Sequence, residues 1–533
     1  MKNKIAKICL FAAFSLLLAF IVRGETQAGT YYVSPGGSSS WANCSNISTP
    51  CAVSTALGNA VAGDIVMFMD GTYNAPTSPT YRDLVWNPAH SGTSGNPITF
   101  KALNRHQAII KGTGSTSDSG VYAQPVIGAI GRNYITWDGF YLYARNSSDT
   151  ADIFVTARID GSTGCSVINN TFRAGAHNYG GATNNAGVFF QGAHYLIIEN
   201  NTFFGFIETS NNLNNGAIIG YPTNYVTIKN NTIYNCTQGI FLKDRVSYVV
   251  VENNFIRDCF YGVAAYNSNG GSSTDVIIHN NVFGGCGRAA ISTSNSSPVN
   301  NQVISNNTIY KSSSLSYDYG DIELKNTGIS SSAYPKVYNN IIDRGWASLV
   351  TDGSANMLAE CDHNQYSGSL RIITHKYQTF TTYTALAAWQ SSGELYGGGN
   401  PGAGSLSSNP LFVNSSGSMS QLADFALQAG SPCIGAGRSG VDMGADISLV
   451  GVNSDGSVYP TETCSDGIQN QDETGIDCGG VCPACEVPVT YSLSNFISLL
   501  NNWLGAGDED SDFNNDGIVN TRDLGIMMSN WNQ

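Results

Sequence analysis

Charge is scarce in this sequence. Only 12% of its 533 residues are Asp, Glu, Lys or Arg, and 25 basic residues against 39 acidic ones give a formal net charge of -14. A chain so poor in charge is typical neither of intrinsic disorder nor of a helical bundle. The shortage of positive charge also removes the attraction that draws proteins to nucleic acid. We therefore expect a folded protein whose partners are not nucleic acids.

Long apolar runs are also missing, except at the N-terminus. The chain opens with the basic stretch MKNKIAK, the apolar run ICLFAAFSLLLAFIV and then small residues. This order is typical of a secretory signal peptide over residues 1–28, cleaved near Ala28. An uncleaved anchor helix is the alternative, although the run is shorter than the roughly 20 residues that a span needs. After cleavage we expect no membrane span, and a secreted protein that can be attached to a cell surface.

What the sequence contains in quantity is glycine (59 residues) together with Asn, Ser, Thr and β-branched residues. This composition indicates many short strands joined by polar turns. The central region also repeats itself loosely around a doubled Asn, as CSVINNTF, LIIENNTFF, VTIKNNTIYNC, VVVENNFIRDC, VIIHNNVFGGC, QVISNNTIY and KVYNNIID. Successive Asn pairs are 31, 30, 23, 27, 26 and 33 residues apart, so the strands are constant while the loops vary in length.

Each repeat has one apolar face that it cannot bury alone. Copies stacked in parallel share one continuous core, and the second Asn of each pair can turn inward and hydrogen-bond the next Asn in the stack. The predicted ladder consists of Asn170, Asn201, Asn231, Asn254, Asn281, Asn307 and Asn340. The predicted fold class is therefore an all-β parallel β-helix, which is a solenoid; a jelly roll is the alternative.

Two further columns follow from the same register. Five residues after the second Asn of three repeats stand Cys236, Cys259 and Cys286, which we expect to stack as small buried thiols. The position before the Asn pair is predicted to face outward and to form surface charge pairs, in the column Glu199, Lys229, Glu252 and His279.

Several segments resemble a known superfamily. The opening TYYVSPGGSSSW, then AVAGDIVMFMDGTY, SGTSGNPITFKAL, NYITWDGFYLY and the Asn repeats are similar to the right-handed parallel β-helix superfamily, which includes pectate, alginate and chondroitin lyases. The closing DFALQAGSPCIGAG with DMGAD resembles the end of many such domains. The resemblance implies a right-handed parallel β-helix over residues 29–447 and a polysaccharide as substrate or ligand. It does not fix the reaction, because one fold hosts many functions.

Lyases of this superfamily use a Lys or Arg as base together with a positive charge that stabilises the enolate. The best basic cluster is GIFLKDRVSYVVVENN, in which Lys243, Asp244 and Arg245 are predicted to lie between strands of adjacent coils. Lys243 matches the position of the catalytic Lys in chondroitinase B-like lyases, but the Arg that those enzymes add one coil later is Tyr266 here. These three residues are the candidate catalytic residues; solvated turn residues are the alternative interpretation.

Hydrolases on this fold need paired carboxylates instead. The polygalacturonase pattern is absent, and no Asp-Asp pair occurs in the chain. A second candidate is YDYGDIELKN, where Asp318, Asp321, Glu323 and Lys325 can form a carboxylate-rich cleft or simply an ordinary loop and strand. Aromatic residues that can stack on sugar rings are Tyr261, Tyr266, Tyr317 and Tyr319.

The C-terminal region differs in charge from the rest. Residues 461–533 hold 12 Asp or Glu against one Arg, and DFNNDGIVNTRD within them matches a calcium loop. The predicted Ca²⁺ ligands are Asp512, Asn514, Asp516, the backbone carbonyl of Ile518, Asn520 and Asp523. Asp at the last ligand position and the helix behind it resemble a dockerin, so residues 489–533 are predicted to be a small α-helical calcium-binding dockerin-like module. An Asp/Asn-rich turn that binds no ion is the alternative.

Dockerins carry two such halves. Residues 492–503 align with residues 520–531, each ending in Asn-Trp, but no oxygen ligands precede the first copy. One calcium site is therefore expected. The resemblance implies a cohesin-like protein partner for the module.

Cysteine usage fits export, where disulfides are stable. Cys44 with Cys51 is predicted to form one bridge, and the cluster that follows a linker at 448–463 is predicted to form two, in a rigid spacer over residues 464–485. The members of that cluster are Cys464, Cys478, Cys482 and Cys485, whose pairing stays open and for which a zinc site is the alternative.

The sequence thus predicts a secreted carbohydrate-active β-helix that degrades polysaccharide, by a lyase-type reaction in preference to hydrolysis, and that a dockerin-like module attaches to a partner or cell surface. A non-catalytic extracellular β-helix for glycan binding or adhesion is the alternative.

Overall fold

The computed structural model describes residues 28–458 and the single residue Val519. Within 28–458 it leaves out residues 76–85, 113–125, 144–154, 175–185, 208–214, 268–270, 296–298, 313–319, 327–332, 344, 354–356, 368–369, 377–378, 416–418 and 455–456. The chain divides into two compact units, Met1–Tyr459 and Pro460–Gln533, and the fold below is that of the first. The predicted Cys-rich spacer, the calcium ligands and the signal peptide before Ala28 lie outside the described residues.

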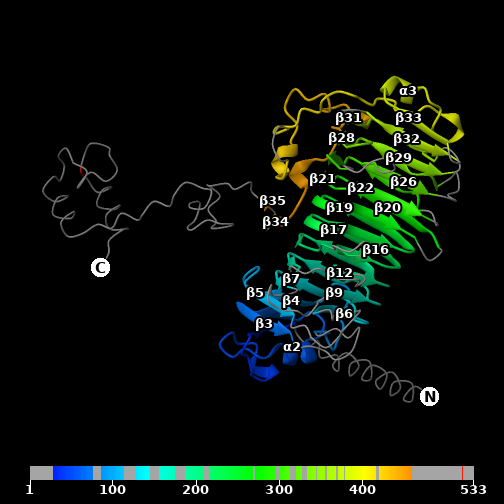
Figure 1. The fold of residues 1–533 in the computed structure, drawn as a ribbon. Helices are drawn as coiled ribbons and strands as arrows, with labels where there is room; N and C mark the ends of the chain where they lie inside the picture. The colour runs from blue at the N-terminus through cyan, green and yellow to red at the C-terminus, as the bar shows by residue number, and fades with distance from the viewer. Residues whose placement is uncertain are drawn as a thin grey trace, which may run out of the picture. The chain divides into compact units, whose positions relative to one another are not determined.

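The chain winds through successive coils whose strands pair in parallel with their equivalents in the coils above and below, and so build three elongated faces (Figure 1). Face A is the thirteen-stranded sheet of β1 Thr30–Val33, β2 Ile65–Phe68, β4 Ile98–Ala102, β7 Ile135–Asp138, β10 Ser166–Ile168, β13 His194–Glu199, β16 Thr223–Lys229, β18 Val246–Glu252, β20 Ser273–His279, β23 Val299–Asn300, β24 Val303–Ser305, β27 Lys336–Tyr338 and β30 Glu360–Asp362.

A second sheet of twenty strands forms the other two faces, which are joined where β17 Thr232–Lys243 and β19 Phe255–Tyr266 run through both. Face B begins after the Asn corner and contains, with the first halves of β17 and β19, β3 Gly71–Ala75, β5 Ala108–Gly112, β8 Tyr141–Tyr143, β11 Thr171–Arg173, β14 Thr202–Phe204, β21 Val282–Gly284, β25 Thr308–Tyr310, β28 Ile341–Asp343 and β31 Gln365–Ser367. Face C contains, with their second halves, β6 Ile127–Ile130, β9 Val155–Asp160, β12 Ala186–Gln191, β15 Gly216–Gly220, β22 Ala289–Asn295, β26 Ile322–Asn326, β29 Leu349–Gly353, β32 Ile372–Lys376 and the antiparallel β33 Thr379–Tyr383.

The corner between faces A and B holds the inward asparagine file. Asn201 is fully buried, and its backbone N–H and its Nδ2 donate to Oδ1 of Asn231 at 2.9 and 3.0 Å. The same pair of bonds links each of the seven predicted asparagines to the next. Asn364 is preceded by His363 where the other coils have the first Asn of a pair. Its Oδ1 accepts from Asn340 and so adds an eighth rung. Every rung therefore satisfies the buried amide of its neighbour.

The first residue of each Asn pair has a different task. These residues are in the left-handed conformation, for example Asn253 (φ 57°) and Asn280 (φ 53°), which Asn tolerates better than most residues. They also hold a C-terminal strap, residues 419–452, that returns along face B and is orange in Figure 1. Asn280 Oδ1 accepts from the backbone N–H of Asp446 at 2.7 Å, and the Asn253 carbonyl accepts from Gly451 at 2.8 Å. The doubled Asn therefore serves both the core and the strap.

The strap buries apolar side chains on the outer side of face B. Phe425, Met443 and Val450 pack with Phe255 and Tyr310 in one cluster. The strap also contains the short 3-10 helices η4 Leu422–Phe425, η5 Arg438–Gly440 and η6 Ile447–Leu449, and the hairpin of β34 Asn453–Ser454 and β35 Ser457–Val458 follows it. Ordered packing thus continues to the buried Val452, past residue 447, where the sequence predicts the domain to end.

The corner between faces C and A also uses left-handed residues. Gly164, Asp275 and Asn301 occupy it in three coils. Tyr134 (φ 53°) occupies it in the coil before Gly164, and Tyr195 (φ 53°), Tyr225 (φ 58°) and Tyr248 (φ 55°) occupy it in three consecutive coils. This conformation costs a residue with a side chain roughly 1–2 kcal/mol. The rings of Tyr195, Tyr225 and Tyr248 stack at centroid distances of 4.8 and 4.7 Å. Two stacks contribute about 0.5–1.5 kcal/mol each, which offsets only part of the conformational cost of three residues.

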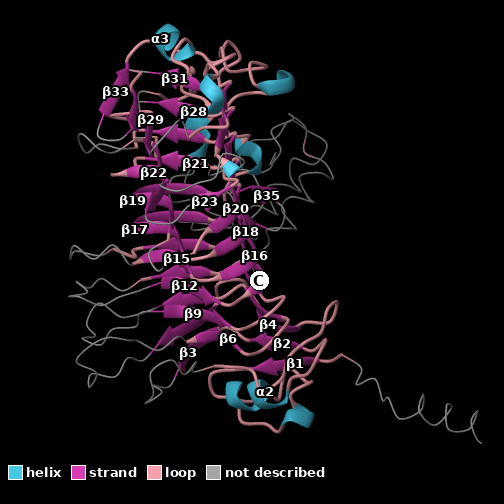
Figure 2. Cartoon of the chain, turned by 90° about the vertical axis from the view of Figure 1, so that its right-hand side faces the viewer, coloured by secondary structure: helices cyan, strands magenta, loops and turns pink. Residues whose placement is uncertain are grey.

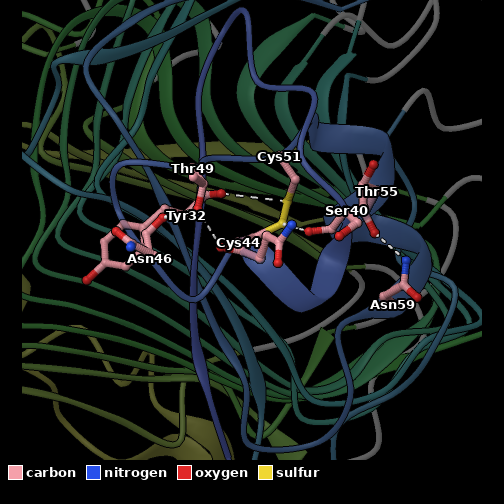
Figure 3. The surroundings of a disulfide bond; sticks show 9 residues. Tyr32, Ser40, Cys44, Asn46, Thr49, Cys51, Thr55 and Asn59 are labelled. Atoms are coloured by element: carbon pink, nitrogen blue, oxygen red, sulfur yellow. Dashed lines mark hydrogen bonds between the residues drawn. A yellow bond between two sulfur atoms is a disulfide. The ribbon is translucent and has the colours of Figure 1, made fainter.

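Other elements cover both ends of the β-helix. At the N-terminal end, η1 Trp41–Asn43 and α2 Val53–Asn59 cover the first coil, and α3 Leu386–Gln390 with η3 Tyr396–Gly398 lies at the other end (Figure 2). A Cys44–Cys51 disulfide staples the N-terminal cap (Figure 3). The backbone of Tyr32 bonds both cysteines, donating to Cys44 O at 2.8 Å and accepting from Cys51 at 3.0 Å. Closed ends prevent pairing of the terminal strands with other chains.

The strand register also places the two other predicted columns, which are the buried cysteines and the outward charged residues. Cys236 pairs with Cys259 on β17 and β19, and with Cys286 they are buried and unbridged. Burial raises the pKa of the Cys286 thiol to about 12, so it stays a neutral packing group. The outward column pairs Glu199 with Lys229 at 3.3 Å.

Candidate functional site

The last or next-to-last residues of the face C strands form one row, which we call the strand-end row. Strand pairing matches Lys243 with Tyr266, Tyr266 with Ser294, Ser294 with Lys325, Lys325 with Asp352 and Asp352 with His375. Tyr221, directly after β15, stands beside Lys243 on the other side. Neighbouring positions in such a row are about 4.8 Å apart. Unlike the asparagine file, this row changes its residue type at nearly every coil.

Lys243 is the most unusual member of the row. Its side chain is only 8% exposed, and Nζ donates a hydrogen bond to the Tyr221 hydroxyl at 2.8 Å. Nζ also lies 4.8 Å from the centre of the Tyr221 ring and 5.0 Å from that of Phe241. Burial lowers the pKa of Lys243 to about 8, although the adjacent Asp244 carboxylate opposes this shift. The interpretation of Lys243 as a solvated turn residue is therefore wrong: it ends strand β17 and is buried among aromatic rings.

The other two predicted catalytic residues form the corner after β17. Asp244 and Arg245 are both left-handed (φ 52° and 60°), and the Asp244 backbone N–H donates to the Tyr266 carbonyl at 2.9 Å. The Arg245 side chain is exposed and lies along Gly271, where a Cβ would collide with it. Lys243 thus ends face C with the buried Asp244 carboxylate acting on it, whereas the exposed Arg245 side chain lies beyond the corner.

An apolar row lies two residues before the strand-end row. Phe189, Ile219, Phe241 and Ala264 lie on the outer side of face C, together with Tyr261, and are at most 7% exposed. Arg288 lies over the Tyr261 ring at 5.0 Å. Tyr221 and Tyr266 are half-buried, so the cluster reaches the surface at the strand-end row.

Sequence reasoning missed Tyr221, Phe189 and Phe241. A signal for them was available, because AGVFFQ, GAIIGY and GIFLK are continuous apolar runs. A strand with one solvated face alternates, whereas these runs indicate strands that are buried on both sides. The burial of all five residues of β15 agrees with that pattern.

The second predicted cluster lies farther along face C. Glu323 on β26 is 1% exposed, and its Oε2 accepts from Ser292 Oγ at 2.8 Å, while Oε1 has no hydrogen-bond partner among the described residues. Burial raises the pKa of Glu323, although Lys325, Ser292 and Arg288 oppose the shift. Asp321 is also buried and leaves no room for a Cβ at Gly345. Asp321 and Glu323 are therefore buried, and Glu323 and Lys325 lie on a strand, β26, as the interpretation of an ordinary loop and strand predicts.

Several predicted sites cannot be placed. Asp318, Tyr317 and Tyr319 lie outside the described residues, as do the calcium ligands and Cys464, Cys478, Cys482 and Cys485. Across the part of the chain that the structure describes, no cluster of His, Cys, Asp and Glu is arranged to hold a metal ion. Nor is any helix in that part both long and apolar enough to cross a membrane.

Comparisons with known proteins address the fold. The family model described as right handed beta helix region matches residues 156–342. Among solved structures, pectate lyase Pel9A is 16% identical, with a TM-score of 0.51 over 79% of this chain and 96% of that one. A rhamnogalacturonan lyase (16% identity, TM-score 0.42, 60% and 82% coverage) and the GH136 lacto-N-biosidase from Eubacterium ramulus (13%, 0.45, 69% and 68%) are also similar. No curated protein matches the chain. The family model and the Pel9A likeness confirm the predicted right-handed parallel β-helix.

Proposed function

We propose that this chain is a secreted, carbohydrate-active protein that binds an acidic polysaccharide along the strand-end row and cleaves it by β-elimination, with Lys243 as the base. The observation that carries the proposal is the burial of Lys243 against the Tyr221 and Phe241 rings, which lowers its pKa to about 8. A lysine that is partly neutral near physiological pH can accept a proton, whereas an ordinary lysine cannot.

The reaction needs only groups of this row and the substrate. Neutral Lys243 takes the proton from the carbon next to the uronate carboxylate, and the electron pair left behind forms a carbon–carbon double bond as the glycosidic carbon–oxygen bond breaks. The departing oxygen accepts a proton from Tyr221, whose hydroxyl lies 2.8 Å from Lys243 Nζ. The products are one chain with an unsaturated uronate at its end and one with an ordinary sugar end.

Positive charge along face C supports an acidic substrate. Lys325 lies three strand steps from Lys243, a distance of about 14 Å, which spans more than one sugar of an extended chain. It is therefore placed to pair with a neighbouring uronate and to fix the register of the substrate.

Two solved structures of this fold fit the proposal by their names, pectate lyase and rhamnogalacturonan lyase. For the C-terminal region, we propose that the loop from Asp512 to Asp523 binds Ca²⁺ and that the dockerin-like module attaches the protein to a cohesin-like partner. Its support is the alternating oxygen ligands in the sequence.

A second candidate function, hydrolysis, rests on a separate observation. Asp321 and Glu323 are buried carboxylates two residues apart around β26, and the pKa of Glu323 is raised by burial. Two carboxyl groups, one of which burial holds toward its neutral form, are the groups that glycosidases use as acid and base.

One assay separates these functions. The full chain is incubated with pectin, polygalacturonate, alginate and glycosaminoglycans, with and without Ca²⁺, and unsaturated uronates are measured by absorbance. We expect absorbance to rise on at least one polyuronate and to fall by about 10³-fold in Lys243→Met. Lys101→Met, a half-exposed lysine paired with Asp138 on face A, is the matched control and is expected to keep full activity.

The opposite results are equally clear. Reducing sugar without absorbance, lost in Glu323→Gln and kept in Lys243→Met, would replace elimination by hydrolysis. The absence of any product from acidic and neutral glycans would leave the non-catalytic binding function in place of both.

A further inference from the structure

Three tyrosines at the corner between faces C and A have no part in the site described above. The exposed fractions of Tyr195, Tyr225 and Tyr248 are 59%, 44% and 47%, although large aromatic side chains are usually buried. They stand in consecutive coils, and their rings are parallel within 3° and 6°. We call them the tyrosine ladder.

The rings are offset from one another. Their centroids are 4.8 and 4.7 Å apart, which exceeds the 3.5–4.0 Å at which carbon atoms make contact, so parallel rings must slide sideways to touch. Each ring therefore leaves part of its face open as well as its hydroxyl edge. The ladder offers repeated apolar steps, with one hydroxyl for each coil.

Backbone conformation shows that the corner does not require tyrosine, although Tyr134 also occupies it in the coil before Gly164. Neighbouring coils place Gly164, Asp275 and Asn301 at the same left-handed position, and these residue types adopt it at lower cost than Tyr. Gly164 also lets the Tyr134 ring lie across its coil, since a Cβ at that position would collide with the ring. Aromatic surface is thus favoured along this edge at the expense of backbone strain. Strain of this kind is concentrated at functional sites.

The surroundings of the ladder define its ligand. The residue before each tyrosine is polar and half-buried (His194, Asn224 and Ser247), and the outward residue two positions after it is aliphatic or a threonine (Ile197, Thr227 and Val250). Formal charge lies at the margins of the ladder: Asp275 occupies the same corner in the coil after Tyr248, Arg245 is exposed three residues before Tyr248, and Glu199 pairs with Lys229 at 3.3 Å. The ladder itself consists of aromatic, aliphatic and hydrogen-bonding groups, which are complementary to a neutral sugar, whose ring has apolar C–H faces and hydroxyl edges. It offers no cluster of positive charge to an acidic chain.

We propose that the tyrosine ladder is a second, non-catalytic glycan-binding surface that takes an uncharged, extended polysaccharide running along the helix axis. A repeat of one ring per coil suits a polymer of identical units, because the same contact recurs at each step. The proposal rests on the proposed function only in taking a glycan as ligand, since the ladder needs neither Lys243 nor cleavage. Tyr248 follows Lys243 by five residues around one corner, a chain path of at most about 18 Å. A protein held on a neutral polymer at the ladder would thus keep its face C site close to that polymer.

Binding to neutral polymers tests the proposal. The full chain is run in affinity electrophoresis through gels containing xylan, galactomannan or hydroxyethyl cellulose, and separately polygalacturonate. We expect retardation by at least one neutral polymer. The triple variant Tyr195→Asn, Tyr225→Asn, Tyr248→Asn should raise the dissociation constant at least tenfold. Asn occurs naturally at this corner as Asn301, so the variant should keep its fold, which circular dichroism and the melting temperature check directly.

Matched variants separate binding from stacking and from catalysis. The triple Tyr→Phe variant keeps the rings and is expected to bind within about threefold of the parent. Tyr396→Asn removes a tyrosine of similar exposure (54%) elsewhere and should change nothing. Lys243→Met should bind the neutral polymer like the parent, even where polyuronate cleavage is lost. No retardation by any neutral polymer, or equal retardation of the folded triple Asn variant, would overturn the proposal while leaving the cleavage assay unaffected.

Discussion

Two rows of polar residues run parallel to the helix axis, and they follow opposite rules. In the asparagine file inside the corner of faces A and B, every rung is the same residue and each amide bonds the next. In the strand-end row of face C, the residue changes from Tyr221 to Lys243 to Tyr266, and Lys243 is buried beside two aromatic rings. The same residue in every coil indicates a structural role that all coils share, which is packing. A residue that differs from coil to coil indicates a local role, and we propose that the local role of Lys243 is catalysis.

Breaking the asparagine file should have the largest effect. Asn254 Oδ1 accepts from both the backbone N–H and Nδ2 of Asn231, and its own Nδ2 donates to Asn281 Oδ1. In Asn254→Leu, the buried backbone N–H of Asn231 loses its acceptor and the bonds of Asn254 Nδ2 are lost as well, so unfolding in guanidinium should show a loss of about 4 kcal/mol. Asn253→Gly is the matched control: glycine keeps the left-handed backbone and loses one half-buried bond to Asn280, so we expect less than about 1 kcal/mol. Equal losses would show that the file has no special role.

The cleavage activity that we assign to the strand-end row should depend on pH. Only neutral Lys243 can act as a base, and burial lowers its pKa to about 8. The value of kcat/KM for polyuronate cleavage should therefore rise roughly tenfold per pH unit well below pH 8 and then level off, a change of about 50-fold between pH 6 and pH 8. The measurement is the initial rate of absorbance at low substrate concentration. A flat profile across this range would exclude Lys243 as the base.

The smallest expected effect is the change in the free energy of unfolding caused by Lys243→Met. This change is a gain in stability, whereas the asparagine substitution causes a loss. At pH 7 the parent buries a charged lysine at a net cost, because burial lowers the Lys243 pKa by more than the Asp244 carboxylate raises it, so methionine should stabilise the fold by about 1–2 kcal/mol. The folded pKa of about 8 lies below the ordinary 10.5, so the unfolded chain holds more protons between these values and the parent gains stability as pH rises through them. The advantage of methionine should shrink from pH 7 to pH 10.5 in urea unfolding curves. A destabilised variant at pH 7 would mean that Lys243 is a structural residue.

The difference between a residue that repeats in every coil and one that does not explains which parts of the structure the sequence could predict. The coil register and the seven inward asparagines follow from a repeat that is visible as text, and the extra rung at Asn364 was missed because His363 breaks the doublet. The environment of Lys243 could not be read in this way, because Tyr221 and Phe241 meet it only through strand pairing and the sequence shows a lone lysine in a polar turn. The strap was hidden for a similar reason, since its partners Asn253 and Asn280 come from coils far away in the chain.

The most direct test of the claim that the strand-end row is a site is a crystal structure of the inactive Lys243→Met protein soaked with an oligogalacturonate hexamer. The account predicts a sugar chain across the outer side of face C, with one uronate over residue 243 beside Tyr221 and Tyr266 and another carboxylate near Lys325. A hexamer bound elsewhere, with the strand-end row uncontacted, would contradict it.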